Sequence, residues 1–161
     1  MKAIVIGATG AVGQDLVKTL LYDDRYETVT TFTRRPLGFT HPKIQSFIVD
    51  FNLPDTWHHL VQGDVLFSAL GTSLKQAGSK EAQYRVDHDY QLSFARAARE
   101  NGVPHMVLVS SVGADSSSRF FYLQLKGLIE KDVEALHFPS LTILRPPSLI
   151  RKHAKRPAET V

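Results

Sequence analysis

Short apolar runs alternate with longer segments of helical periodicity along this chain of 161 residues. The short runs are rich in Val, Ile, Thr and Phe, which is typical of strands buried in a parallel sheet. Strands are expected at 3–6, 28–33, 44–49, 65–70, 105–110 and 141–144, and helices at 12–21, 54–60, 79–100 and 119–136. This alternation predicts an α/β fold with a doubly wound parallel sheet in three layers, a Rossmann fold with strand order 3-2-1-4-5-6.

The first expected strand leads directly into a glycine-rich turn, which reads Gly7-Ala8-Thr9-Gly10-Ala11-Val12-Gly13. In a dinucleotide-binding turn, the first glycine permits the sharp bend and the second lets the backbone approach a pyrophosphate. The third lets the following helix pack on the sheet. The N–H groups and the dipole of that helix then face the phosphates. These seven residues are therefore predicted to bind a dinucleotide, with a plain strand–turn–helix corner as the alternative.

Two arginines, Arg34 and Arg35, follow the second expected strand. Folds that prefer NAD carry an acid here for the ribose 2′-hydroxyl, whereas a guanidinium pairs well with a phosphate. The pair therefore predicts NADP as the cofactor, with NADPH preferred over NADH. A solvated arginine pair is the alternative.

Two further segments follow expected strands and are candidates for contact with the cofactor. Asp50 can accept a hydrogen bond from the adenine amino group, with Phe51 packed nearby, although a cap of the strand end is an alternative role for Asp50. Leu70, Gly71 and Thr72 end the fourth strand, where a glycine leaves room for the cofactor to cross the sheet edge.

The composition is that of an ordinary globular domain, with 43% hydrophobic and 22% charged residues. No apolar run has the length of a membrane span, and a formal net charge of +3 gives no argument for nucleic acid. The lack of cysteine and of a signal peptide favours a cytoplasmic location. His58 and His59 have no further ligand converging on them, so no metal is expected.

Tyr122 and Lys126 are four residues apart in the last expected helix, so their side chains share a face. A nearby ammonium favours the phenolate and lowers the pKa of a tyrosine, which suits Tyr122 to exchange a proton with a carbonyl or an alcohol. Ser110 and Ser111 end the preceding strand, and a serine hydroxyl beside the tyrosine can bind a developing oxyanion. The alternative is an ordinary helix surface pair.

Several segments together resemble the atypical short-chain dehydrogenases/reductases, and more closely the Tat-interacting-protein-like oxidoreductases among them. These segments are the glycine-rich turn, Leu70-Gly71-Thr72, Ser110-Ser111-Val112-Gly113-Ala114-Asp115, Tyr122-Leu123-Gln124-Leu125-Lys126-Gly127 and Leu144-Arg145-Pro146. The resemblance implies an NADP-binding Rossmann fold with a Ser-Tyr-Lys site. In that pattern Ser111 polarises the substrate, Tyr122 transfers the proton, and Lys126 also holds the nicotinamide ribose.

The expected function is therefore that of an NADP(H)-dependent oxidoreductase acting on a small carbonyl or alcohol. A non-catalytic protein that senses NADP(H) and acts through protein partners is the alternative. A single domain over 1–161 is expected. Members of the family usually continue for several helices past the last strand, so a missing C-terminal substrate lid and a minimal lid are both left open. A monomer and a homodimer remain open, and the basic run 151–156 is either a solvated end or a contact for phosphates or an acidic partner.

Overall fold

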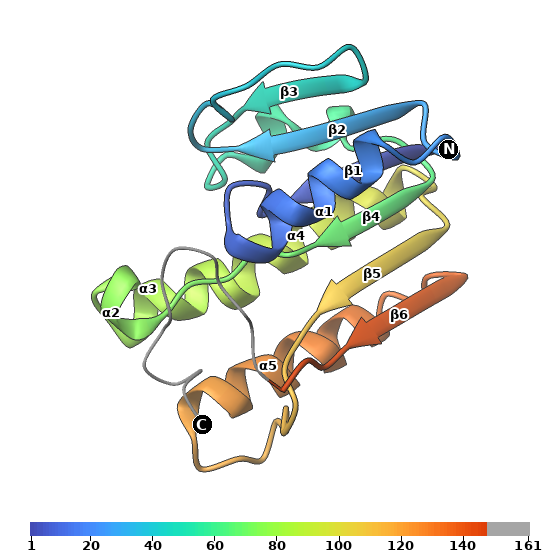
Figure 1. Ribbon diagram of the computed structural model, residues 1–161. Coiled ribbons are helices and arrows are strands. Elements are labelled where there is room, and N and C mark those ends of the chain that lie inside the picture. The colour runs from blue at the N-terminus through green and yellow to red at the C-terminus, as the bar shows by residue number, and fades with distance from the viewer. Residues whose placement is uncertain (148–161) are drawn as a thin grey trace.

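The computed structural model describes residues 1–147, so the basic run at 151–156 lies outside the described residues. Six strands form one sheet: β1 (Lys2–Ile6), β2 (Thr28–Thr33), β3 (Ile44–Ile48), β4 (Val65–Ser68), β5 (His105–Val109) and β6 (Ser140–Leu144). Their order is β3-β2-β1-β4-β5-β6, and every neighbouring pair is parallel (Figure 1). The predicted fold and strand order are confirmed. Because all strands run the same way, their carboxyl ends meet at one edge.

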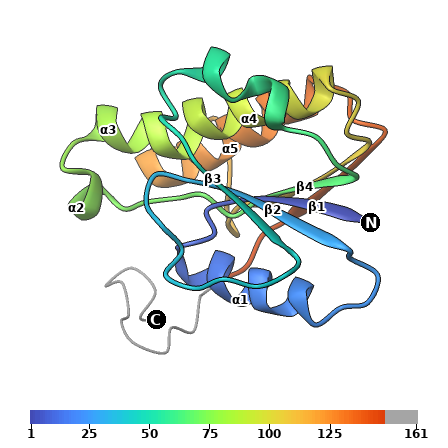
Figure 2. The ribbon, with the colours of Figure 1, turned by 90° about the horizontal axis from the view of Figure 1, so that it is seen from above.

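Helices cover the two faces of this sheet unequally (Figure 2). Helix α1 (Ala11–Leu21) lies on one face, and α4 (Gln91–Glu100) and α5 (Phe121–Glu134) lie on the other. The central strand β1 contributes side chains to the core on both faces of the sheet. Its Ala3 and Val5 pack in the cluster under α1, whereas Ile4 and Ile6 pack in the larger cluster under α4 and α5. This burial on both faces explains why the strand reads as a continuous apolar run.

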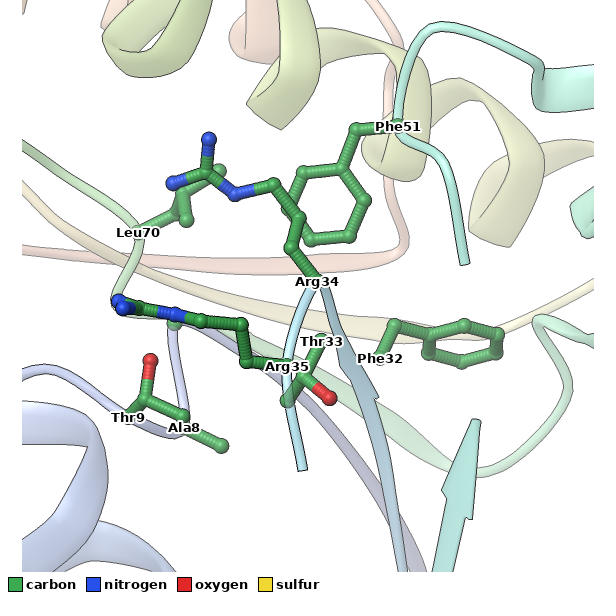
Figure 3. Close-up of a pocket in the computed structure, with 9 residues that line it drawn as sticks. Ala8, Thr9, Phe32, Thr33, Arg34, Arg35, Phe51 and Leu70 are labelled. Carbon is green, nitrogen blue, oxygen red and sulfur yellow. The ribbon is translucent and has the colours of Figure 1, made fainter. Parts of the chain in front are cut away.

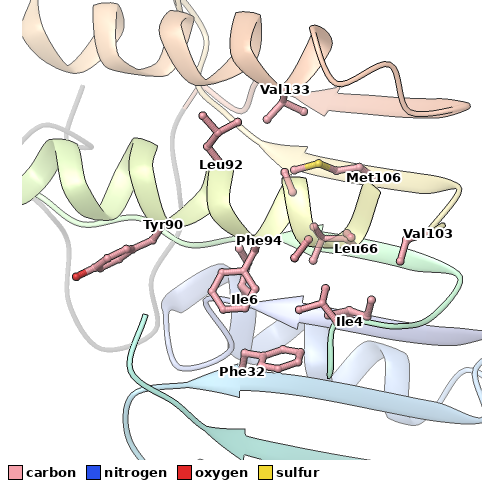
Figure 4. Packing of buried hydrophobic residues seen from close by; sticks show 14 of the residues in the cluster. Ile4, Ile6, Phe32, Leu66, Tyr90, Leu92, Phe94, Val103, Met106 and Val133 are labelled. Atoms are coloured by element: carbon pink, nitrogen blue, oxygen red, sulfur yellow. The ribbon is translucent and has the colours of Figure 1, made fainter. Parts of the chain in front are cut away.

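The larger cluster includes a group of aromatic side chains that pack against one another. Figure 4 shows Phe94 of α4 and Phe32 of β2 facing each other across this core, and their ring centres are 5.4 Å apart. Trp57 is completely buried and stacks on Phe94, with ring centres 3.9 Å apart. The prediction of one helix at 54–60 is wrong, because the segment is not a continuous helix. The chain forms two 3₁₀ turns, η1 (Pro54–Thr56) and η2 (His58–Leu60), on either side of the inserted Trp57.

The helix predicted at 79–100 is confirmed over residues 80–100, but its middle turn widens into a π-helix. The structure has α2 (Leu74–Ala77), α3 (Lys80–Tyr84), a π-helix η3 (Arg85–Tyr90) and then α4. Ser79 caps α3, since its hydroxyl accepts the Ala82 N–H at 3.1 Å. Two contacts accompany the wider π turn: the buried Asp87 accepts the Thr72 N–H at 2.7 Å, and the Gln91 side chain donates to the Asp87 carbonyl at 2.5 Å. Single π turns of this kind often occur at functional sites.

Within residues 1–147, no helix combines the length and the apolar character needed to cross a membrane.

Candidate functional site

The glycine turn after β1 lies against the end of β4. Gly7 has a φ of +83°, and a Cβ there would stand 2.4 Å from the Ala69 backbone. A Cβ on Gly13 would stand 1.8 Å from the Gly7 oxygen, so α1 presses directly on the turn. Gly10 differs from both, because it precedes α1 with a φ of −78° and its Cβ would approach only Gly7 O, at 3.4 Å. Gly7 and Gly13 therefore shape the turn, whereas Gly10 leaves open space above it.

A pocket opens beside this turn at the carboxyl edge of the sheet. Its walls come from the turn, the end of β2, the segment after β3 and the segment after β4: Gly7, Ala8, Thr9, Phe32, Thr33, Arg34, Arg35, Phe51 and Leu70. Figure 3 shows Arg34 extending alongside Phe51 and Arg35 extending on the side of Thr9. Predicted residues from four separate segments thus meet at one place. Ala11, Val12 and Gly13 belong to α1 and line neither this pocket nor the one described next.

The sequence reasoning missed Thr33, the last residue of β2. It lines the pocket, yet only 4% of it is exposed, and its Oγ1 has no hydrogen-bond partner within the described part of the chain. A buried hydroxyl without a partner costs free energy. Because Oγ1 has almost no accessible surface, the part of Thr33 that lines the pocket is not its hydroxyl.

A second pocket lies on the other side of Arg34, and sequence reasoning missed it too. Its lining residues are Arg34, Thr72, Gln76, Ala77, Ala82, Arg85, Val86 and Tyr90. Arg34 is the wall that the two pockets share, and its guanidinium stands 5.8 Å from the centre of the Phe51 ring. The sequence offered no reason to place Arg85 at this site. A helix was predicted there, but nothing in its pattern indicated that Arg85 lies near the end of β2.

Asp50 takes the alternative role that the sequence left open. Its Oδ1 accepts the Asn52 N–H at 2.9 Å and the Asn52 side-chain amide at 3.1 Å, which makes it the cap of the turn after β3. Asp50 lines neither of the two pockets formed by the described residues, whereas the neighbouring Phe51 is buried and lines the first.

The second group of predicted residues lies at the same edge, near β5 and the start of α5. Tyr122 is 41% exposed, whereas Lys126 one turn later is only 5% exposed. The Lys126 ammonium stands 5.6 Å from the centre of the Tyr122 ring. A Cβ on Gly71 would lie 3.8 Å from Lys126 Nζ and 3.7 Å from Asp87 Oδ1, so both side chains are close to that glycine. The predicted glycine at 71 thus leaves space directly beside the predicted lysine.

The two serines after β5 have different surroundings. Ser110 is 5% exposed, and its hydroxyl donates to Glu130 Oε1 at 2.5 Å. Ser111 is only partly buried, and its hydroxyl donates to the Val112 carbonyl at 3.1 Å. Of the two, Ser111 is therefore the one available to a substrate.

The loop after Ser111 is fixed against α5. The Asp115 N–H donates to the Leu123 carbonyl at 3.0 Å, and a Cβ on Gly127 would stand 2.1 Å from the Ser116 nitrogen. Gly127 therefore allows a very close approach between this loop and the helix that carries Tyr122 and Lys126.

An ion pair between the buried Glu130 and the more exposed Arg145 supports this end of the site. Arg145, just after β6, donates to Glu130 through Nε at 2.9 Å and through Nη2 at 2.6 Å. Burial raises the pKa of Glu130, but the hydrogen bonds from Arg145 and Ser110 and the charges of Arg145 and Lys126 outweigh it, so the pKa is lowered overall. The same hydrogen bonds raise the pKa of Arg145. Both groups are therefore charged at neutral pH.

A model of the NAD(P)H-binding family matches residues 7–160. The chain belongs to this family. It lies among the atypical short-chain dehydrogenases/reductases, as the sequence resemblance indicates. The match includes every element that forms the two pockets and the Tyr122–Lys126 site.

Curated relatives agree with this placement. The chain is 38% identical over 162 residues to "Protein FMP52, mitochondrial" of Debaryomyces hansenii, an alignment that covers 96% of this chain and 70% of that protein. It is 39% identical over 160 residues to "Protein HTATIP2" of Rattus norvegicus, covering 96% of this chain and 66% of the rat protein. The expectation of a cytoplasmic location is wrong, because the yeast relatives are named mitochondrial. A reducing environment, which is all that the missing cysteines indicate, does not single out the cytoplasm.

Solved structures share the fold at low sequence identity. The Bordetella bronchiseptica enzyme WbmH in complex with NAD⁺ superposes with a TM-score of 0.77 at 15% identity, over 95% of this chain and 58% of that one. A short-chain dehydrogenase/reductase superfamily protein from Agrobacterium tumefaciens with bound NAD gives 0.76 at 18% identity, over 90% of this chain and 48% of that one. The chain therefore spans about half of the length of these two proteins. At such identities the likeness concerns the fold.

Proposed function

We propose that the protein is an NADP(H)-dependent oxidoreductase that reduces a carbonyl compound or oxidises an alcohol. The observation that carries the proposal is the placement of Tyr122 and Lys126 at the same sheet edge as the arginine-lined pocket beside the glycine turn. Membership of the NAD(P)H-binding family supports the cofactor class.

The residues around the first pocket fit a dinucleotide phosphate. Gly10 leaves the space that a pyrophosphate needs, and the N–H groups at the start of α1 are directed at it. Arg34 and Arg35 offer guanidinium groups to the 2′-phosphate. The choice of NADP over NAD is part of the proposal.

The second pocket fits the adenine base. Ala77, Ala82 and Val86 provide an apolar surface, and Arg34 and Arg85 provide planar cations on which an aromatic ring can stack. In this arrangement the Arg34 side chain moves from the Phe51 ring and stacks on the adenine. No hydrogen bond from the adenine to Asp50 is required.

The reacting groups are assigned to the other end of the site. NADPH, when bound, supplies the hydride that adds to the carbonyl carbon. The Tyr122 hydroxyl gives its proton to the carbonyl oxygen, and solvent replaces that proton because the side chain is 41% exposed. The Lys126 ammonium favours the phenolate left behind, and Ser111 donates a hydrogen bond to the reacting oxygen. Oxidation of an alcohol follows the same steps in reverse.

Two measurements test this proposal. Fluorescence titration determines whether NADPH binds, and a panel of aldehydes, ketones and quinones determines whether its oxidation depends on a carbonyl compound. Tight binding with no turnover on any compound would overturn the enzymatic assignment and favour a cofactor sensor. The names of the yeast relatives support a search for the protein in mitochondria.

A further inference from the structure

Glu130 lies on the same buried face of α5 as Lys126, one helical turn further on, and both residues are 5% exposed. A buried carboxylate is costly unless donors surround it. Three hydrogen bonds reach Glu130: one from the Ser110 hydroxyl and two from the Arg145 guanidinium. The carboxylate therefore joins α5 to the residues that follow β5 and β6.

This carboxylate also acts on Lys126. The charge of Lys126 helps to lower the pKa of Glu130, and an interaction between two charges is mutual, so Glu130 favours the charged form of Lys126. Such help matters because burial by itself drives an ammonium toward its neutral form. Within residues 1–147, the ionisable groups near Lys126 include Tyr122 and Glu130 on α5 and Asp87 on η3, and Arg145 binds Glu130.

Glu130 also decides which serine is exposed. Because the Ser110 hydroxyl is held by Glu130 in the interior, the next residue, Ser111, faces outward at the end of β5. One side chain thus contacts the segment that bears Ser111 and influences the charge of Lys126.

We propose that Glu130 is a positioning residue of this site: its carboxylate keeps the Lys126 ammonium charged and anchors Ser110, so that Ser111 faces the reacting centre. The significance of Lys126 and Ser111 rests on the proposed function. The electrostatic effect itself is measurable without cofactor or substrate.

The test is a pH titration of the lysine side chains by NMR, with ¹³C at Cε and with Lys126→Met to assign the Lys126 signal. Glu130→Gln preserves the shape of the side chain and removes its charge. In this variant we expect the midpoint of the Lys126 titration to fall by about one pH unit or more. Glu134→Gln, an exposed position one turn further along α5, is the matched control and should leave the midpoint unchanged.

Arg145→Met provides a second test that does not depend on Glu130→Gln folding. Arg145 is more than half exposed, so this variant should fold, and removing its positive charge should raise the Lys126 midpoint. Opposite shifts in the two variants support the proposal. A Lys126 midpoint in Glu130→Gln equal to that in Glu134→Gln, or one that Arg145→Met leaves unchanged or lowers, would overturn it.

The two proposals can fail separately. If the parent protein turns over no compound but its Lys126 titrates as expected, the enzymatic function is wrong and the role of Glu130 stands. If turnover depends on Tyr122 but Glu130→Gln leaves the titration midpoint of Lys126 unchanged, the proposed function stands. Glu130 is then only a structural anchor.

Discussion

Lys126 Nζ lies 5.6 Å from the centre of the Tyr122 ring, one turn away along α5. The lysine is buried and the tyrosine is partly exposed, so a fixed cation stands behind a phenol that solvent and a ligand can both reach. A surface pair would leave both side chains in water. Here the buried Lys126 has a fixed position behind the ring, and its ammonium, where it stays charged, favours the phenolate form of Tyr122.

Tyr122→Phe is expected to separate binding from chemistry. The ring remains and only the hydroxyl is lost, so NADPH should bind nearly as it does to the parent. Carbonyl-dependent NADPH oxidation should fall by ~10²–10⁴, the usual contribution of a general acid. Steady-state kinetics would measure this, with Tyr22→Phe, a tyrosine that is 86% exposed, as the control. Unchanged turnover would mean that the proton comes from elsewhere.

Replacing both Arg34 and Arg35 by alanine is expected to abolish the preference for NADPH over NADH. We expect NADPH to bind the parent about 1–2 kcal/mol more tightly, the scale of a charge-assisted hydrogen bond. Paired fluorescence titrations would measure the difference, and Arg96→Ala on the exposed side of α4 is the control for lost charge. Equal affinities already in the parent would refute the predicted cofactor choice.

Arg85→Leu is expected to weaken the binding of NADPH and of NADH by the same factor. A guanidinium that stacks on adenine contributes about 0.5–1 kcal/mol at an exposed site, which corresponds to a two- to fivefold loss of affinity. The same titrations would show it, again against Arg96→Ala. A loss confined to NADPH would place the 2′-phosphate, rather than the base, beside Arg85.

Gly10→Ala and Gly13→Ala are expected to differ although they lie three residues apart. The Gly10 Cβ has room in the empty protein, so this variant should fold but bind NADPH at least about tenfold more weakly. The Gly13 Cβ would collide with the Gly7 carbonyl, so this variant should unfold at a lower temperature. Circular dichroism and titration together distinguish the two effects. A Gly10→Ala protein that binds like the parent would contradict the assigned phosphate position.

Glu130→Gln is expected to reduce stability most at neutral pH. The pKa of Glu130 is lowered from its ordinary value of 4.5, so the carboxylate stabilises the folded state above that pH. This contribution disappears as the pH falls through the lowered pKa. The variant should therefore be about 1–3 kcal/mol less stable near pH 7, and the difference should shrink toward pH 3. Thermal unfolding across this range would measure it, and a difference independent of pH would argue against an ionised Glu130.

The fold could be predicted because its signals are local. The β-branched runs and the glycines at 7, 10 and 13 depend on neighbours along the chain. The glycine motif on the first strand, together with right-handed crossovers, favours the strand order that the structure has. The residues after β3 were harder to predict, because the sequence left Asp50 with two plausible roles. In the structure the Asn52 N–H donates to Asp50, which is the capping role.

The parts that failed depend on distant partners. Neither glycine nor proline lies within Arg85–Tyr90, so nothing local marks the π-helix, which accompanies contacts of Asp87 with Thr72 and Gln91. Trp57 breaks its segment into two turns because it stacks on Phe94, far away in sequence. The choice between Ser110 and Ser111 likewise rests on Glu130, twenty residues later.

The π-helix Arg85–Tyr90 limits how the chain can change its length. A π turn holds about one residue more than an α turn, so deleting one residue there should leave an ordinary α-helix. That deletion would remove the wide turn around Asp87, whose carboxylate accepts the Thr72 N–H and whose carbonyl accepts a hydrogen bond from Gln91. Arg85 and Val86, which face Arg34 across the second pocket, lie on this same turn. The residue count of this segment therefore determines the shape of one wall of that pocket.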